Sequence, residues 1–317
     1  MSADKTLKKM QAALGAVGIP SPSENDPIVL DGNAELNIIA WGDPQVSFVS
    51  PLRSSRLSGA CRDLTNMQGS ADVLMLLGDI CEFGKEAEFR MAAGIIGGVS
   101  DKFKNFLAVS GNHDIRVRHY KSQIARFNCF IKSVGGGIAG PDNRYYFSTE
   151  INSYKFIMMG SDSPAFESSH ISDEQIEWLD REIASCGGKP VFVLNHQTLK
   201  RTNGLPVTWL GKGSWRGSVG ESSDKIKAVF EKHKNVIFIT GHLHYGVSEY
   251  NFEDYGSFKA LSLPTVGVIN HGAFSKNGQG YIISVYSDRI VIRARVFCDG
   301  EYVDKEIPNA YVDFKID

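Results

Sequence analysis

Five clusters of polar residues stand directly after short apolar runs in this sequence. They comprise Asp43 and Gln45; Asp79; Asn112, His113 and Asp114; His196; and His242 and His244, which follow the apolar runs 36–41, 73–77, 106–109, 191–194 and 236–239 in turn. Packing alone does not call for carboxylates, amides and imidazoles at such positions. Polar residues that a rigid scaffold presents on loops are often functional, so we interpret the clusters as candidate site residues.

The residue types in these clusters suit metal binding. Two aspartates, one asparagine and three histidines form a mixed nitrogen and oxygen ligand set, which favours Mn, Fe, Zn or Co over Ca or Mg alone. The set exceeds what one ion needs, so two ions that share a bridging carboxylate are the simplest arrangement. Glycines precede Asp43, Asp79, Asn112 and His242, and they permit sharp turns and close backbone approach.

The elements around the clusters indicate an α/β fold. Apolar runs without polar alternation are typical of strands that are covered on both faces. A helix is predicted from residue 172, where Ser172 and Gln175 have the spacing of a capping box, and another over residues 226–230. Strands that alternate with helices predict a sheet whose ligands gather at the carboxyl ends of its strands, which is where the five clusters lie.

The ends of the chain differ from this pattern. Residues 18–35 contain several prolines and indicate a linker or wrapped arm, so we divide the chain into an N-terminal arm, 1–35, and one domain, 36–317. The runs 281–286 and 290–297 predict an antiparallel hairpin, which we expect to complete the second sheet of the domain.

The runs 144–147 and 154–159, in the middle of the chain, predict a similar pair around Asn152 and Ser153.

Composition excludes several classes of protein. With 42% hydrophobic and 22% charged residues, the 317-residue chain is neither disordered nor fibrous. Its 34 basic and 36 acidic residues argue against a nucleic-acid partner, although they leave room for a local basic patch. Five scattered cysteines without a C-x-x-C pair favour reduced thiols and a cytoplasmic location. No apolar run is long enough for a membrane span, and residues 12–19 favour a short surface helix over a signal peptide.

In order and spacing, the clusters resemble the motifs of the calcineurin-like metallophosphoesterase family. Those motifs are D-x-H, G-D-x-x-D/N, G-N-H-D/E, a lone His after a strand, and G-H-x-H. The corresponding stretches are Asp43-Pro-Gln45, Gly78-Asp79-Ile-Cys-Glu82, Gly111-Asn112-His113-Asp114, His196 and Gly241-His242-Leu-His244, which span residues 43–244. Each motif alone is weak evidence, whereas all five in order are specific. The resemblance implies two packed mixed β-sheets with helices on both outer faces.

The resemblance also implies roles for the site residues. One ion would be held by Asp43, Gln45, Asp79 and His244, and the other by Asp79, Asn112, His196 and His242, with Asp79 bridging. The ions would be Mn, Fe or Zn, and a hydroxide that bridges them would attack a phosphomonoester or phosphodiester. His113 would stabilise the transition state or protonate the leaving oxygen, and Asp114 would orient it. Asn112 and His113 would contact the substrate.

Two positions depart from the family pattern. Gln45 stands where the family has His, and Glu82 replaces the usual Asp or Asn. Gln45 keeps open the alternative of a catalytically impaired metal-binding scaffold, and a nuclease of the same fold would need a basic track beside the site. His113 could instead support the metal ligands.

The segment 197–222 is rich in Gly, Ser, Thr and Trp, and its length without periodicity suggests a functional loop over the site. Within it, Trp209, Trp215 and Arg216 could bind an aromatic or anionic substrate. We expect the two tryptophans to pack the loop against the body of the domain.

Overall fold

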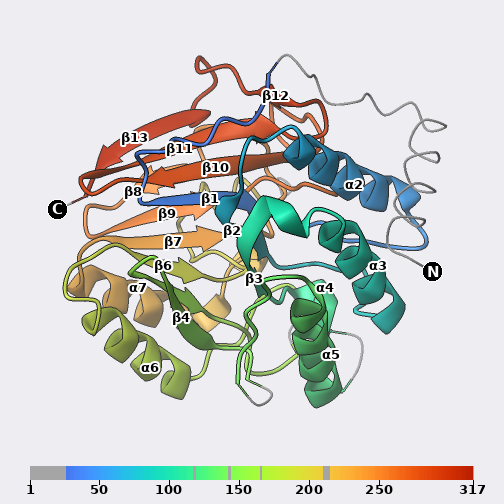
Figure 1. The fold of residues 1–317 in the computed structure, drawn as a ribbon. Coiled ribbons are helices and arrows are strands. Elements are labelled where there is room, and N and C mark those ends of the chain that lie inside the picture. Colours follow the sequence, from blue (N-terminus) through green and yellow to red (C-terminus); the bar gives the residue numbers. More distant parts are fainter. Residues whose placement is uncertain (1–25, 117–118, 142–143, 165, 210–214, 317) are drawn as a thin grey trace.

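Two mixed β-sheets form the centre of the protein in the computed structural model (Figure 1), which describes residues 26–316 except 117–118, 142–143, 165 and 210–214. The first sheet has the order β12-β11-β10-β1-β2-β3, with β13 on β11. Its strands are β1 (Leu36–Trp41), β2 (Ala71–Leu77), β3 (Phe103–Val109), β10 (Gln279–Val285), β11 (Arg289–Val296), β12 (Glu301–Tyr302) and β13 (Tyr311–Lys315). The surface helix expected over residues 12–19 lies outside the described residues.

The second sheet has the order β4-β5-β6-β7-β9-β8. Its strands are β4 (Phe147–Ile151), β5 (Tyr154–Met158), β6 (Val191–Leu194), β7 (Val236–Thr240), β8 (Phe252–Asp254) and β9 (Phe258–Ser262). The predicted hairpin around Asn152 and Ser153 is present, but its first strand is Phe147–Ile151 rather than the run 144–147. The turn places Asn152 and Ser153 at φ of 50° and 65°. Asparagine tolerates this left-handed conformation better than most residues, which suits a tight hairpin turn.

Helices cover both outer faces of the paired sheets, as expected. Helices α2 (Pro51–Thr65), α3 (Glu86–Gly97) and α5 (Tyr120–Ser133) pack on the first sheet, and α6 (Asp173–Ala184) and α7 (Ser223–Lys232) pack on the second (Figure 1). The Ser172 hydroxyl caps α6 by accepting the backbone N–H of Gln175 at 3.3 Å. This confirms the predicted start of the helix.

The alternation of side chains along each strand explains the continuous apolar runs. In β2, Val73, Met75 and Leu77 face the layer between the sheets, while Leu74 and Leu76 face the helices. Because both faces are buried, every position of the run 73–77 in this strand is apolar. The described cysteines, all five in the sequence, form no disulfide. Over the described part of the chain, no helix combines the length and apolar character that crossing a membrane would require.

The placement of the C-terminal hairpin corrects one expectation. The hairpin of β10 and β11 joins the first sheet rather than the second, because β10 pairs antiparallel with β1 from Leu36–Val285 to Ala40–Tyr281. On the outer face, Arg295 of β11 forms a buried two-point contact with the Asp63 carboxylate of α2, at 2.6 and 2.8 Å. Such a contact satisfies two charges that would otherwise be costly to bury, and it holds α2 against the hairpin.

Candidate metal centre

The predicted site residues converge where the strand ends of the two sheets meet. Asp43, Asp79 and Asn112 follow β1, β2 and β3 of the first sheet, and His196 and His242 follow β6 and β7 of the second. Strands β1–β3 are mutually parallel, as are β6 and β7, so their carboxyl ends share one edge of each sheet. The site is therefore assembled from both sheets.

The backbone at the site is bent in an unusual way. The non-glycine residues Asp43, Gln45, Asp79, His242 and His244 all have positive φ, from 39° to 70°. This conformation is costly for side chains with a Cβ, and it concentrates at functional sites, where the surrounding structure imposes it. The turns direct these side chains toward one another instead of alternating them along a strand.

Two glycines allow the loops to approach closely. A Cβ on Gly111 would lie 2.1 Å from Asp79 Oδ1, and one on Gly241 would lie 2.6 Å from Asp43 Oδ2. Neither separation is sterically allowed, so only glycine fits beside these carboxylates.

One group of candidate ligands consists of Asp79, His196 and His242. His196 Nε2 lies 3.3 Å from Asp79 Oδ2 and 3.1 Å from His242 Nδ1. The opposite nitrogen of His196, Nδ1, lies 2.6 Å from the carbonyl oxygen of Leu77. A carbonyl can only accept, so Nδ1 carries a proton and Nε2 is directed at the other ligands, as in histidines that bind metals.

A second group consists of Asp43, Asp79 and His244, and it shares Asp79 with the first. His244 Nε2 lies 3.1 Å from Asp43 Oδ1. Gln45 is buried beside them, and its side-chain Nε2 lies 3.2 Å from Asp79 Oδ2. Two groups that share one carboxylate have the arrangement expected of a pair of ions bridged by Asp79.

Unpartnered polar atoms show that these residues fit a metal. Both side-chain polar atoms of Asn112 are buried without a hydrogen-bond partner among the described residues, and so is His242 Nε2. Buried polar atoms are normally satisfied, and leaving them unpaired is costly. Ligation by a divalent ion would satisfy the Asn112 oxygen, which can accept but cannot donate, and the mixed carboxylate, amide and imidazole donors match that chemistry.

The electrostatics of the cluster also favour a bound cation. Burial alone would raise the pKa of Asp79, but the neighbouring His196 and His113 hold that pKa below its usual range. Burial alone would lower the pKa of His196, but Asp79 and Asp43 raise it to about 9. Burial and the charge of His196 lower the pKa of His242 well below its ordinary value. The carboxylates thus favour positive charge in their midst, which a proton on His196 or a divalent ion can supply.

His113 stands at the edge of the centre, between the ligands and the surface. Its backbone N–H donates to Asp79 Oδ1 at 2.8 Å, and its Nε2 lies 3.9 Å from Asp79 Oδ2. Its Nδ1 lies 2.9 Å from the Glu82 carbonyl oxygen, to which it would donate, and 2.8 Å from Arg116 Nη2, from which it would accept, so it bonds only one of the two at a time. Nε2 therefore faces the candidate metal ligands, while Nδ1 is held from behind.

The structure differs from the expected role of Asp114. Its fully buried carboxylate accepts backbone N–H groups of Ile80 (3.2 Å), Cys81 (3.0 Å) and Gly111 (2.9 Å), and it is not bonded to His113. Burial and the charge of Asp79 raise the pKa of Asp114 to about 7. The one-turn helix α4 (Asn112–Ile115) explains the difference, because it directs successive side chains to different sides.

Sequence reasoning noted Glu82 only as a departure from the family pattern, and it missed Arg116 and Arg53 near His113. Arg116 follows it by three positions, which is a helical neighbour spacing and the one available signal. The Glu82 carboxylate lies 3.5 Å from His113 Nδ1, and its other oxygen pairs with Arg53. No local pattern marks Arg53, because it comes from the start of α2.

The loop 197–222 covers part of the centre. Trp209 is nearly buried and stacks on the ring of His242, with ring centroids 4.8 Å apart and planes at 22°. Trp215 is partly exposed, and Arg201 lies over its ring at 5.8 Å. The predicted packing role holds for Trp209, which fixes the orientation of a candidate ligand. Residues 210–214 of the loop lie outside the described part of the chain.

Comparisons with known proteins agree with this geometry. Over 182 residues, the chain is 19% identical to the glycerophosphodiester phosphodiesterase GpdQ of Enterobacter lignolyticus, across 57% of this chain and 59% of that protein. A dimetal phosphatase of Danio rerio has a TM-score of 0.59 at 13% identity, covering 89% of this chain and 99% of that one. A purple acid phosphatase of yellow lupin (Lupinus luteus) has a TM-score of 0.58 at 13% identity, covering 85% and 52%.

These likenesses carry different weight. At 13% identity, the two solved structures show a shared fold and nothing finer. The chain spans little more than half the length of the phosphodiesterase and of the purple acid phosphatase. The family model of calcineurin-like phosphoesterases matches residues 37–246, which is more than half of the chain and contains every candidate ligand. This chain belongs to the calcineurin-like phosphoesterase family.

Proposed function

We propose that this protein is a dinuclear-metal phosphoesterase that hydrolyses a phosphomonoester or a phosphodiester. The observation that carries the proposal is the pair of ligand groups that share Asp79. Asp43, Gln45, Asp79 and His244 would hold one ion, and Asp79, Asn112, His196 and His242 the other. Two divalent ions held there, with Mn, Fe or Zn best suited to the donors, would polarise the phosphoryl oxygens and lower the pKa of a water nucleophile.

His113 is the protein's own candidate for proton transfer. Its Nε2 faces the candidate metal ligands, and its Nδ1 lies within hydrogen-bond distance of the Glu82 carbonyl and of Arg116, either of which can restrain the ring. A histidine in this position can donate a proton to the leaving oxygen or stabilise charge on the phosphoryl group. The His113 side chain is 16% exposed, which leaves part of the ring open to a substrate.

The surroundings of the site favour a small ester over a nucleic acid. The cations nearest His113 are engaged, since Arg53 pairs with Glu82, and Arg116 lies 3.9 Å from carboxylate oxygens of Glu82 and Glu167. A nuclease needs cations that are free to follow a phosphate backbone. The ring of Phe166 is exposed and lies against the Arg116 guanidinium, at 5.4 Å, which places an apolar surface beside His113.

The test is hydrolysis by the purified, metal-loaded chain of 4-nitrophenyl phosphate and of the corresponding bis-ester, with metal content measured on the same sample. We expect two ions per chain, turnover of at least one ester, loss of activity with a chelator and recovery with Mn. Two firmly bound ions without turnover of either ester would favour the impaired scaffold. Cleavage of single-stranded DNA in preference to both esters would favour the nuclease.

A further inference from the structure

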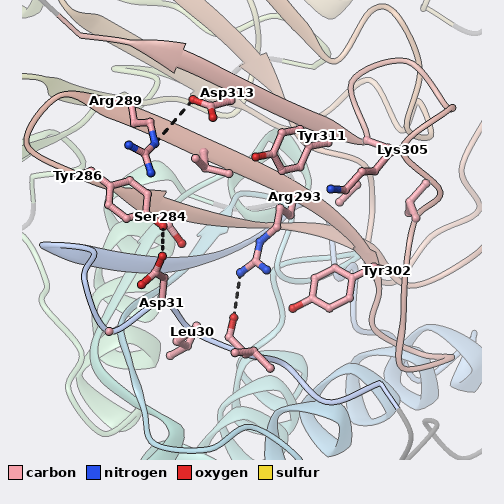
Figure 2. Close-up of a pocket in the computed structure, with 16 residues that line it drawn as sticks. Leu30, Asp31, Ser284, Tyr286, Arg289, Arg293, Tyr302, Lys305, Tyr311 and Asp313 are labelled. Atoms are coloured by element: carbon pink, nitrogen blue, oxygen red, sulfur yellow. Dashed lines mark hydrogen bonds and ion pairs between the residues drawn. The ribbon is translucent and has the colours of Figure 1, made fainter.

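A second candidate binding site lies on the outer face of the C-terminal strands. There, a groove of about 680 Å³ runs between residues 29–32 of the arm and strands β10, β11 and β13 (Figure 2). This volume falls in the range of small-molecule sites. None of the residues that line the groove belongs to the metal centre.

The charged side chains in the groove are unequally engaged. Asp31 accepts the Tyr286 hydroxyl at 2.6 Å and the backbone N–H of Asn33 at 2.9 Å, and Asp313 lies 4.0 Å from Arg289. Both lining carboxylates are thus already paired. Arg289 also lies over the ring of Tyr286, at 4.4 Å.

Two cations in the groove lack an acidic partner. Arg293 donates to the carbonyl oxygen of Val29 at 2.9 Å and lies over the Tyr302 ring at 5.2 Å. Lys305 lies over the Tyr311 ring at 4.4 Å. Among the described residues, no carboxylate lies within ion-pair distance of either cation. Figure 2 shows Arg289 and Lys305 on opposite sides of Arg293, all three in the same groove.

The groove also contains a tyrosine hydroxyl without a partner, an observation that does not depend on charge. The hydroxyl of Tyr302 is buried and has no hydrogen-bond partner among the described residues. The groups of the groove that remain available therefore include the Arg293 guanidinium, the Lys305 ammonium and a tyrosine hydroxyl, all of which can donate. A surface that offers cationic donors, while its acids are already bonded, is complementary to an anion.

We propose that this groove binds a small organic phosphate. Arginine, lysine and tyrosine together suit a phosphate group, which carries more than one negative charge near neutral pH. The groove is much larger than an inorganic phosphate ion requires, and Leu30, Val291 and the ring of Tyr311 supply apolar walls. The ligand therefore carries a ring or short apolar group beside its phosphate. The proposal stands on residues separate from the metal centre, so it does not depend on the function proposed for that centre.

The probe for a test is phenylphosphonate, which has a ring and a dianionic group but no ester bond to hydrolyse. Calorimetric titration of the full, metal-loaded chain should detect a site that Lys305→Gln weakens about tenfold, the scale expected for loss of one charged hydrogen bond. Lys305 makes no hydrogen bond within the described protein, so this variant should fold normally. Turnover at the metal centre should stay unchanged.

Two further variants sharpen the test. Tyr302→Phe removes only the unpartnered hydroxyl, and it should weaken binding without lowering thermal stability. Lys315→Gln is the matched control, because Lys315 is exposed on β13 but does not line the groove. The proposal would be overturned if the Lys305→Gln and Tyr302→Phe variants bound phenylphosphonate as tightly as the wild-type protein does. Equal weakening by Lys315→Gln would also overturn it, since general surface charge would then explain the binding.

A second probe tests the apolar wall. Methylphosphonate carries the same anionic group without the ring, and it should bind the groove several-fold more weakly than phenylphosphonate. Equal affinity for the two probes would overturn the assignment to an organic phosphate and leave a site for phosphate alone.

Discussion

The backbone N–H of Cys81 donates a hydrogen bond of 3.0 Å to the carboxylate of Asp114. The same carboxylate accepts the N–H of Ile80 and of Gly111, so it joins the loop that carries Asp79 to the loop that carries Asn112. Three backbone bonds to one buried carboxylate hold two ligand loops in register. Asp114 therefore contacts the candidate ligand loops through their backbone.

This arrangement predicts the effect of Asp114→Asn. An asparagine keeps the shape but turns one accepting oxygen into a donor that faces N–H groups. We expect the free energy of unfolding to fall by about 1–3 kcal/mol, the cost of leaving a buried hydrogen-bonding group unsatisfied. Metal content should fall with it. Thermal unfolding and elemental analysis measure the two effects, with Asp101→Asn on the surface as control. Normal stability and normal metal content, with slower turnover, would restore the expected role of Asp114 beside His113.

The shared position of Asp79 predicts that Asp79→Asn removes most bound metal and nearly all hydrolysis. A neutral amide cannot bridge two cations as a carboxylate does, so both ions are weakened together. The control is Asp72→Asn, because Asp72 lies on the preceding strand and bonds Lys104 and the backbone of Asn37 instead. Full metal content in the Asp79 variant, measured by elemental analysis, would contradict the bridging assignment.

The position of His113 at the edge of the centre predicts that His113→Ala retains metal and slows turnover by about 10²-fold or more, as expected for loss of a general acid. Esters with good leaving groups need little protonation of the leaving oxygen, so their turnover should slow less. A series of aryl phosphates with leaving groups of increasing pKa measures this dependence. His233→Ala, which removes a histidine paired with Asp180 far from the ligands, should leave the rates unchanged. An equal loss across the series would assign His113 to charge stabilisation or structure.

The sequence predicts the site better than it predicts what surrounds it. Each candidate ligand follows an apolar run within a few residues, so local pattern alone marks Asp79 or His242 as lying at a strand end. The pairing of β10 with β1 joins residues that are more than two hundred positions apart, and no local signal specifies which sheet the hairpin joins. The same limit applies to Arg53, whose contact with Glu82 depends on how α2 packs.

Gln45 is the site residue that departs from the family motif, and the structure shows how it can still serve. Its backbone N–H donates to the carbonyl oxygen of Asp79 at 2.8 Å, and its φ of 39° turns the side chain toward the bridging carboxylate. The side-chain Nε2 lies 3.2 Å from Asp79 Oδ2. The side-chain amide can flip, which exchanges its oxygen and nitrogen with little change in shape. The Gln45 oxygen can therefore occupy the place where its nitrogen now lies. The position is thus suitable for a ligand, but the donor is a neutral amide oxygen.

We therefore expect the ion held by Asp43, Gln45, Asp79 and His244 to be the looser of the two, because an amide oxygen is a weaker donor than imidazole for Mn, Fe and Zn. Added Mn should raise the activity of the purified protein, and Gln45→His should tighten this site and reduce the dependence on added metal. Metal titration of both forms, with occupancy and rate followed together, measures the effect. Gln68→His adds a histidine at an exposed position and should change neither quantity. Two firmly held ions in the natural protein, with affinity and rate unaffected by Gln45→His, would show that the amide does not limit metal binding.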